Sequence, residues 1–106
     1  MMNNGVILSI IQGDSYQRNV KIMGIDSSLI EEIYLSSSKL ELKKKLTYSK
    51  CLQKWVFKLT PEETKNLKAI STDFDITIRC VSDDVFTVIY KGTIKVLPKS
   101  NEVWGD

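Results

Sequence analysis

The stretch FDITIRCVSDDVFTVIYKGTIKVL, residues 74–97, alternates apolar and polar residues on both sides of a cluster of turn-forming residues. A period of two is the pattern of a strand that buries one face. Ser82-Asp83-Asp84 is predicted to be the turn that joins the two strands into a hairpin, and Gly92 is predicted to mark a bulge or bend. The residues expected to point inward are Phe74, Ile76, Ile78 and Cys80 in the first strand and Phe86, Val88, Tyr90, Ile94 and Val96 in the second.

A short helix is predicted before this hairpin, near residues 61–68. Thr60 and Glu63 have the spacing of a capping box, in which each side chain accepts a hydrogen bond from the backbone N–H of the other residue. Pro61 stands at the first helical position, where its missing N–H costs nothing. Because a helix of about two turns is marginal by itself, we expect packing through Leu67 to hold it.

Three more segments predict strands. VILSIIQ (residues 6–12) and SYQRNVKIM (residues 15–23) are two strands, or one strand that switches sheets, around a break at Gly13-Asp14. CLQKWVFKL (residues 51–59) is a core strand. The residues that share a face are Tyr16, Arg18, Val20 and Ile22 in the second segment and Trp55, Phe57 and Leu59 in the third.

The segment between residues 26 and 47 is ambiguous. SSLIEEIYL could form a helix capped by Ser27 or Ser28, but its triplet IYL favours a strand. We predict a turn at residues 26–28, a strand at residues 30–36 and a Ser-rich connection. LELKKKLTY then predicts a second strand, whose inward residues are Leu40, Leu42 and Leu46.

Residues 1–106 are predicted to form a single domain, since this length supports one hydrophobic core and not two. Several short strands and one helical turn at a crossing between sheets favour an all-β fold, an immunoglobulin-like antiparallel β-sandwich. An open α+β sheet is the alternative, but it needs a longer helix to cover one face.

Composition favours a folded, globular domain without a membrane-spanning segment. Hydrophobic residues make up 42% and charged residues 26% of the chain, which is ordinary for a folded domain. The net charge of +2 is too small to attract nucleic acid or anionic lipid by itself. The N-terminus lacks the pattern of a signal peptide, and no apolar run is long enough to span a membrane. Cys51 and Cys80 are expected to be free and half-buried.

We predict no enzyme activity, no metal and no cofactor. The chain has no histidine, which removes the commonest general base and the commonest zinc ligand. The acidic pairs Glu31-Glu32, Glu62-Glu63 and Asp83-Asp84 are interpreted as structural. Neighbouring residues on a strand point to opposite sides, and the helix cap explains Glu62-Glu63. The basic run KLELKKKL interleaves with leucine instead of aromatic residues, so we interpret it as a solvated strand face or a guarded edge.

Three stretches resemble the signatures of a family of small tailed-phage structural domains, best known as the N-terminal domain of the baseplate upper protein. They are IIQGDSYQRNVKI, FKLTPEETKNLKA and FDITIRCVSDDVFTVIYKGTIKVLP, with matching positions at Gln12-Gly13-Asp14, residues 59–64 and residues 92–96. This resemblance implies an immunoglobulin-like docking module of a phage tail or baseplate.

Two hypotheses for the function follow. The first is a non-enzymatic phage or prophage structural or assembly protein, in the virion or the bacterial host cytoplasm. Its partners would be phage structural proteins or other copies of itself, with no nucleic acid, membrane or small-molecule substrate. The alternative is a small carbohydrate-binding or cell-surface-binding module. Val103 and Trp104 in the tail NEVWGD are the candidate protein interface, although Trp104 could instead make a last core contact.

Overall fold

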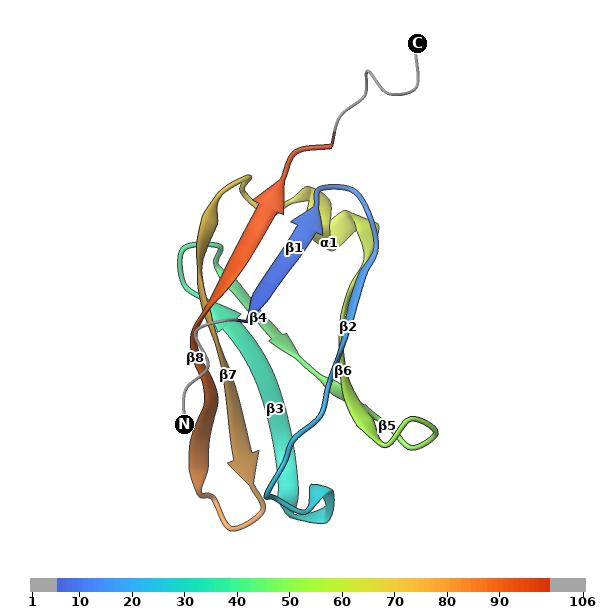
Figure 1. Ribbon diagram of the computed structural model, residues 1–106, viewed down its shortest axis with the longest axis vertical. Coiled ribbons are helices and arrows are strands. Elements are labelled where there is room, and N and C mark those ends of the chain that lie inside the picture. The colour runs from blue at the N-terminus through green and yellow to red at the C-terminus, as the bar shows by residue number, and fades with distance from the viewer. Residues whose placement is uncertain (1–5, 100–106) are drawn as a thin grey trace.

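The computed structural model describes residues 6–99, which form two facing β-sheets (Figure 1). The large sheet has five strands in the order β1-β8-β7-β3-β4, and the small sheet has three in the order β2-β6-β5. In chain order the strands are β1 (Ile7–Ile11), β2 (Tyr16–Val20), β3 (Ile30–Ser37), β4 (Leu42–Lys45), β5 (Thr47–Ser49), β6 (Lys54–Leu59), β7 (Ser71–Cys80) and β8 (Val85–Leu97). The predicted all-β sandwich is confirmed. Its immunoglobulin-like character stays a prediction.

The first and last strands of the fold run parallel, which corrects the prediction of an antiparallel sandwich. Ile7 of β1 lies opposite Thr93 of β8, and Ile11 lies opposite Leu97. The other strand pairs in the described part of the chain are antiparallel. The exception arises because the turn after β1 takes the chain into the other sheet. β1 therefore cannot form a hairpin with β2, and it joins the edge of the large sheet beside β8.

The hydrophobic core fills the space between the sheets, and the predicted inward faces of β6 and β7 are confirmed. The buried side chains of these two strands are Trp55, Phe57, Leu59, Phe74, Ile76, Ile78 and Cys80. Alternation predicted them well because each of these strands has one neighbouring sheet to bury against.

Two of the three residues predicted to point inward from the first half of β8 are exposed, and the third, Val88, packs against the core and is partly buried. Phe86 and Tyr90 are 46% and 49% exposed, whereas Ile94 and Val96 are buried as expected. The pairing with β7 shifts register twice, on either side of Ile76, with one extra residue on β8 each time. The shift between Phe74 and Ile76 places Ile89 opposite Ile76, so Tyr90 points outward. The other shift restores the original face: Phe86 lies opposite buried Ile78, and its exposed side chain lines a hollow with Val20 and Ile22.

In the irregularity between Phe74 and Ile76, Lys91 of β8 adopts a positive φ of 57°, and its N–H donates to Asp75 Oδ1 at 2.9 Å. The bulge therefore lies beside Gly92 and not at it.

The absence of a side chain at Gly92 allows the Phe74 ring to pack closely against the backbone of β8. A Cβ at this position would lie 2.6 Å from Cε1 and Cζ of the Phe74 ring. The buried ring of Phe74 thus rests on the bare backbone of β8.

The helix α1 (Pro61–Lys65) begins with the predicted capping box, because Thr60 accepts from the Glu63 N–H and Glu63 accepts from the Thr60 N–H. It ends before residue 68, so it is shorter than predicted. Leu67 is buried after its end, as expected.

The ambiguous segment forms a strand, as predicted, and the turn before it is a 3-10 helix, η1 (Ser27–Leu29). The next predicted strand is split, with β4 in the large sheet and β5 in the small sheet on either side of buried Leu46.

Both cysteines are free, but neither is half-buried as predicted: Cys51 is exposed and Cys80 is buried. Cys51 lies in a turn because β6 begins later than expected, at Lys54. Between residues 6 and 99, no helix is long and apolar enough to cross a membrane.

Candidate protein-interaction site

The sandwich has an open side, where the outermost strands β1 and β2 of the two sheets adjoin (Figure 1). The sequence of β1, ILSII, has no charged residue, and its outward side chains Ile7 and Ile11 are 48% and 42% exposed. Natural edge strands are usually protected by charges, prolines or bulges. β1 has none of these devices.

The backbone of β1 presents hydrogen-bonding groups along this side. Thr93 donates its N–H to the Val6 carbonyl at 2.9 Å, and Gln12 donates to the Leu97 carbonyl at 2.9 Å. Because alternate residues of a strand face one neighbour, Ile7, Ser9 and Ile11 direct their backbone groups away from β8.

Two of these edge groups are already engaged by nearby residues. Arg18 Nη1 of β2 donates to the Ile7 carbonyl at 3.5 Å, and the Asp14 N–H donates to the Ile11 carbonyl at 3.1 Å. Ser9 at the centre of β1 has both its N–H and its carbonyl directed to the open side. The edge can therefore accept a short added strand.

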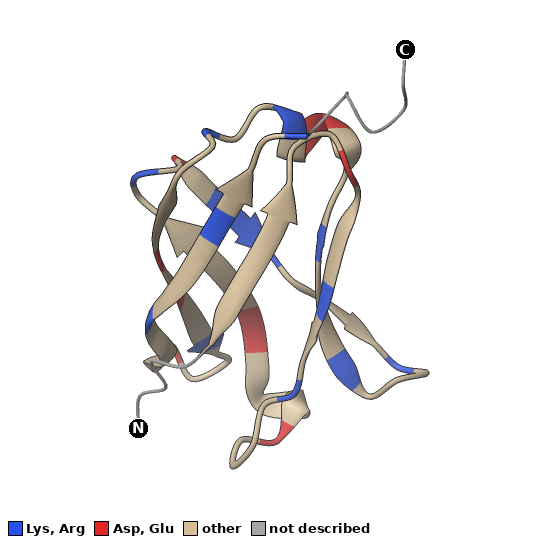
Figure 2. Cartoon of the chain, turned by 45° about the horizontal axis from the view of Figure 1, so that its top comes forward, with Lys and Arg blue, Asp and Glu red and all other residues tan. Residues whose placement is uncertain are grey.

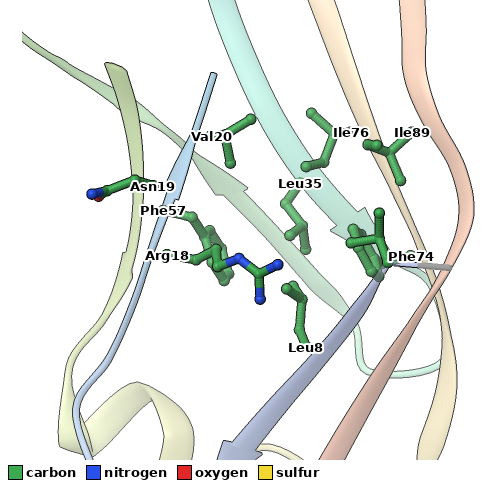
Figure 3. Close-up of a pocket in the computed structure, with 10 residues that line it drawn as sticks. Leu8, Arg18, Asn19, Val20, Leu35, Phe57, Phe74, Ile76 and Ile89 are labelled. Carbon is green, nitrogen blue, oxygen red and sulfur yellow. The ribbon is translucent and has the colours of Figure 1, made fainter. Parts of the chain in front are cut away.

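An apolar cavity of about 160 Å³ opens between the sheets beside this edge (Figure 3). Arg18 lies opposite Phe57 in the pairing of β2 with β6, so it belongs to the inward face of β2. Its guanidinium group reaches across the space between β2 and β1, as Figure 3 shows. The apolar side chains that line the cavity include Leu8, Val20, Leu35, Phe57, Phe74, Ile76 and Ile89.

Three cations lie around the open side without an acidic partner in the described part of the chain. Arg18, Lys21 and Lys95 make no ion pair with any residue between 6 and 99. In Figure 2, β1 is uncharged along its length, and basic residues lie on β8 and β2 near it. This side of the molecule is therefore suited to a partner that offers apolar and acidic groups.

The opposite edge of the large sheet, β4, has the sequence LKKK. Its lysines Lys43 and Lys45 are exposed, which agrees with the predicted guarded edge. Lys44 points the other way and forms an ion pair with Glu63 of α1 at 2.5 Å. The two edges of one sheet are thus chemically different.

Within residues 6–99, each of the three acidic pairs contributes at least one carboxylate to an ion pair: Glu31 and Glu32, Glu63, and Asp83. Arg79 lies 3.2 Å from Glu32, 3.5 Å from Glu31 and 3.7 Å from Asp83. Desolvation opposes ionisation of Glu32, but Arg79 and Lys45 outweigh it and lower the pKa of that carboxyl.

The pKa of Glu63 is lowered by the hydrogen bond from the Lys44 side chain and by the bond from the Thr60 backbone. Within residues 6–99, no three His, Cys, Asp or Glu side chains gather as metal ligands would.

The predicted interface residues Val103 and Trp104 lie outside the described residues. Sequence reasoning did not identify the cavity, but alternation had placed Arg18 among apolar residues on one face of its strand. A cation on an otherwise apolar strand face was the available signal. No protein-family model matches the chain, and no curated protein matches it in sequence.

Proposed function

We propose that this protein is a non-enzymatic structural or assembly component of a phage or prophage tail or baseplate, which docks on other proteins through its open side. The observation that carries the docking proposal is the uncharged β1 edge, with exposed Ile7 and Ile11 beside an apolar cavity. Strand addition at such an edge supplies main-chain hydrogen bonds, and neighbouring pockets select side chains.

The phage assignment rests on the resemblance of three sequence motifs. Two of them meet in the fold, because Gly13 of QGD donates its N–H to Thr64 of the TPEET segment at 2.9 Å. Lys99 also contacts Asp14 of the first motif, through an ion pair of 2.7 Å. The motifs therefore maintain the end of the sandwich from which β1 and β2 extend.

One observation favours docking over a carbohydrate-binding module, and a second supports the non-enzymatic role that both hypotheses share. Between residues 6 and 99, the exposed aromatic residues Tyr48, Phe86 and Tyr90 lie on strands β5 and β8 and do not form a cluster on loops. The shifted carboxyl pKa values have ion pairs and hydrogen bonds as their causes, which supports a non-enzymatic role.

The decisive experiment compares Ser9→Pro with Ser9→Ala in the full chain. Proline removes the N–H that faces the open side and leaves the pairing with β8 intact, as edge positions allow. Alanine removes the same hydroxyl and keeps the N–H. Each variant is co-purified with the tail and baseplate proteins of neighbouring genes, and its fold is checked by circular dichroism.

We expect the proline variant to lose these partners and the alanine variant to keep them. A folded Ser9→Pro protein that retains every partner would show that the β1 edge is not the contact. Retention of a glycan, with no protein partner bound to the unaltered chain, would favour the carbohydrate module instead.

A further inference from the structure

We propose that residues 101–106 of a second copy of this chain bind at the open side, with Trp104 in the cavity and a neighbouring carboxylate on Arg18. This inference rests on the docking function proposed above and identifies the partner as the protein itself.

The sequence of this segment, NEVWGD, matches the chemistry of the site. In an added strand, side chains two residues apart point to the same face. Glu102, Trp104 and Asp106 would therefore face the space between the sheets together, while Val103 would lie on the outer face near Ile7 and Ile11. The segment offers one large aromatic side chain between two acids.

The cavity suits an aromatic side chain. Its volume of about 160 Å³ and its aliphatic and phenyl lining can be compared with an engineered apolar cavity of about 150 Å³ that accepts benzene. Tryptophan is among the residues most enriched at the energetic centre of protein interfaces.

Arg18 supplies the complementary charge. It makes no ion pair within residues 6–99, and its one hydrogen bond, to the Ile7 carbonyl, is 3.5 Å long. A bond of this length is weak, so a carboxylate can replace it with a charge-assisted bond. The Ile7 carbonyl is then released to accept an N–H from the added strand.

A second copy is the favoured source of the segment because of the direction in which β8 runs. β8 passes Ile89, beside the cavity, and ends at Leu97, next to Ile11 at the far end of β1. Lys99 is held to Asp14 at that same end by an ion pair of 2.7 Å. The chain would have to reverse direction and cross β1 to reach its own cavity. The cavity of another molecule requires no reversal, and the resulting contact is head-to-tail.

The test uses two full-length variants that damage opposite halves of this contact. Arg18→Glu damages the receiving site, and Trp104→Ala removes the inserted side chain. Lys58→Glu is the matched control, because it makes the same charge change one position away in the β2–β6 pairing, on the outward face. Sedimentation velocity over a range of concentrations measures the assembly of each protein alone and of equimolar mixtures.

We expect the unaltered chain and the Lys58→Glu control to self-associate. For each damaging variant, the dissociation constant of self-association should rise by at least about thirtyfold, as for the loss of an interface hot spot. An equimolar mixture of Arg18→Glu and Trp104→Ala should form a one-to-one dimer, because one intact site and one intact tail remain.

Three results would overturn the inference: no dimer in that mixture, self-association unchanged by Trp104→Ala, or a monomeric unaltered chain that Trp104→Ala destabilises. The last result would place the tail in its own cavity. The proposed docking function is tested separately by the Ser9 variants. If Ser9→Pro loses its partners and Ser9→Ala keeps them, docking at β1 is supported even where the tail inference fails.

Discussion

Thr64 holds the turn between the two sheets through its hydroxyl, which accepts the Gly13 N–H at 2.9 Å and donates to the Asp14 carbonyl at 2.8 Å. Thr64 is fully buried, and Gly13 adopts a φ of 86°, a conformation that favours glycine. Gln12 adds a bond of 2.7 Å from its side chain to the Leu67 carbonyl. The short helix therefore fixes the point at which the chain leaves β1 for β2, and with it the open side.

Replacing Thr64 by valine should test this clamp. Valine keeps the shape but leaves the partly buried Gly13 N–H and Asp14 carbonyl without their partner, which costs about 1–3 kcal/mol. Urea denaturation measures the free energy of unfolding. Thr64→Ser is the control, because it keeps the hydroxyl; a serine variant less stable than the valine variant would show that packing of the methyl group outweighs the hydrogen bonds.

Gly92→Ala should destabilise the sandwich by about 1–3 kcal/mol, the usual range for overpacking a core. The new methyl group would meet the Phe74 ring 2.6 Å from its Cβ. If this clash is the cause, the cost of Gly92→Ala should be smaller when Phe74 is already leucine. Additive effects of the two substitutions in thermal unfolding would contradict it.

Ionisation of Glu63 should make the free energy of unfolding depend on pH in the acid range. Its pKa is lowered by the hydrogen bonds from Lys44 and the Thr60 backbone, so its contribution is present above the unfolded pKa and disappears as the pH falls through the folded value. Stability should therefore decline as the pH is lowered from the ordinary glutamate value of 4.5.

Glu63→Gln can still accept the Thr60 N–H but has no charge to lose. The difference in unfolding free energy between the unaltered chain and this variant should shrink across that acid range. A difference that stays constant with pH would show that ionisation of Glu63 contributes nothing.

The two thiols should react at different rates. Exposed Cys51 should react with a thiol reagent in the native protein, whereas buried Cys80 should react only after denaturation, with no reductant needed. Counting modified thiols by mass spectrometry checks this, and Cys51→Ser should abolish the fast reaction. Fewer than two reactive thiols in denatured, unreduced protein would indicate oxidation.

Local sequence determined much of this fold. Alternation predicted the inward faces of β6 and β7, and the spacing of Thr60 and Glu63 predicted the capping box. These features depend on residues within a few positions of one another, so propensity, periodicity and turn chemistry are sufficient to reveal them.

Tertiary structure decided the features that depend on distant segments. The parallel pairing of β1 with β8 joins the two ends of the fold, and the bulges of β8 depend on its register with β7. Neither the parallel pairing nor the bulges can be recognised in the local sequence, because the alternation of a strand shows which residues it buries but not which strand it pairs with. Alternation placed Arg18 on one face of its strand with Tyr16, Val20 and Ile22. Only the approach of two sheets turned that position into a cation beside an apolar cavity, since a cavity is created by residues that the chain brings together from several strands.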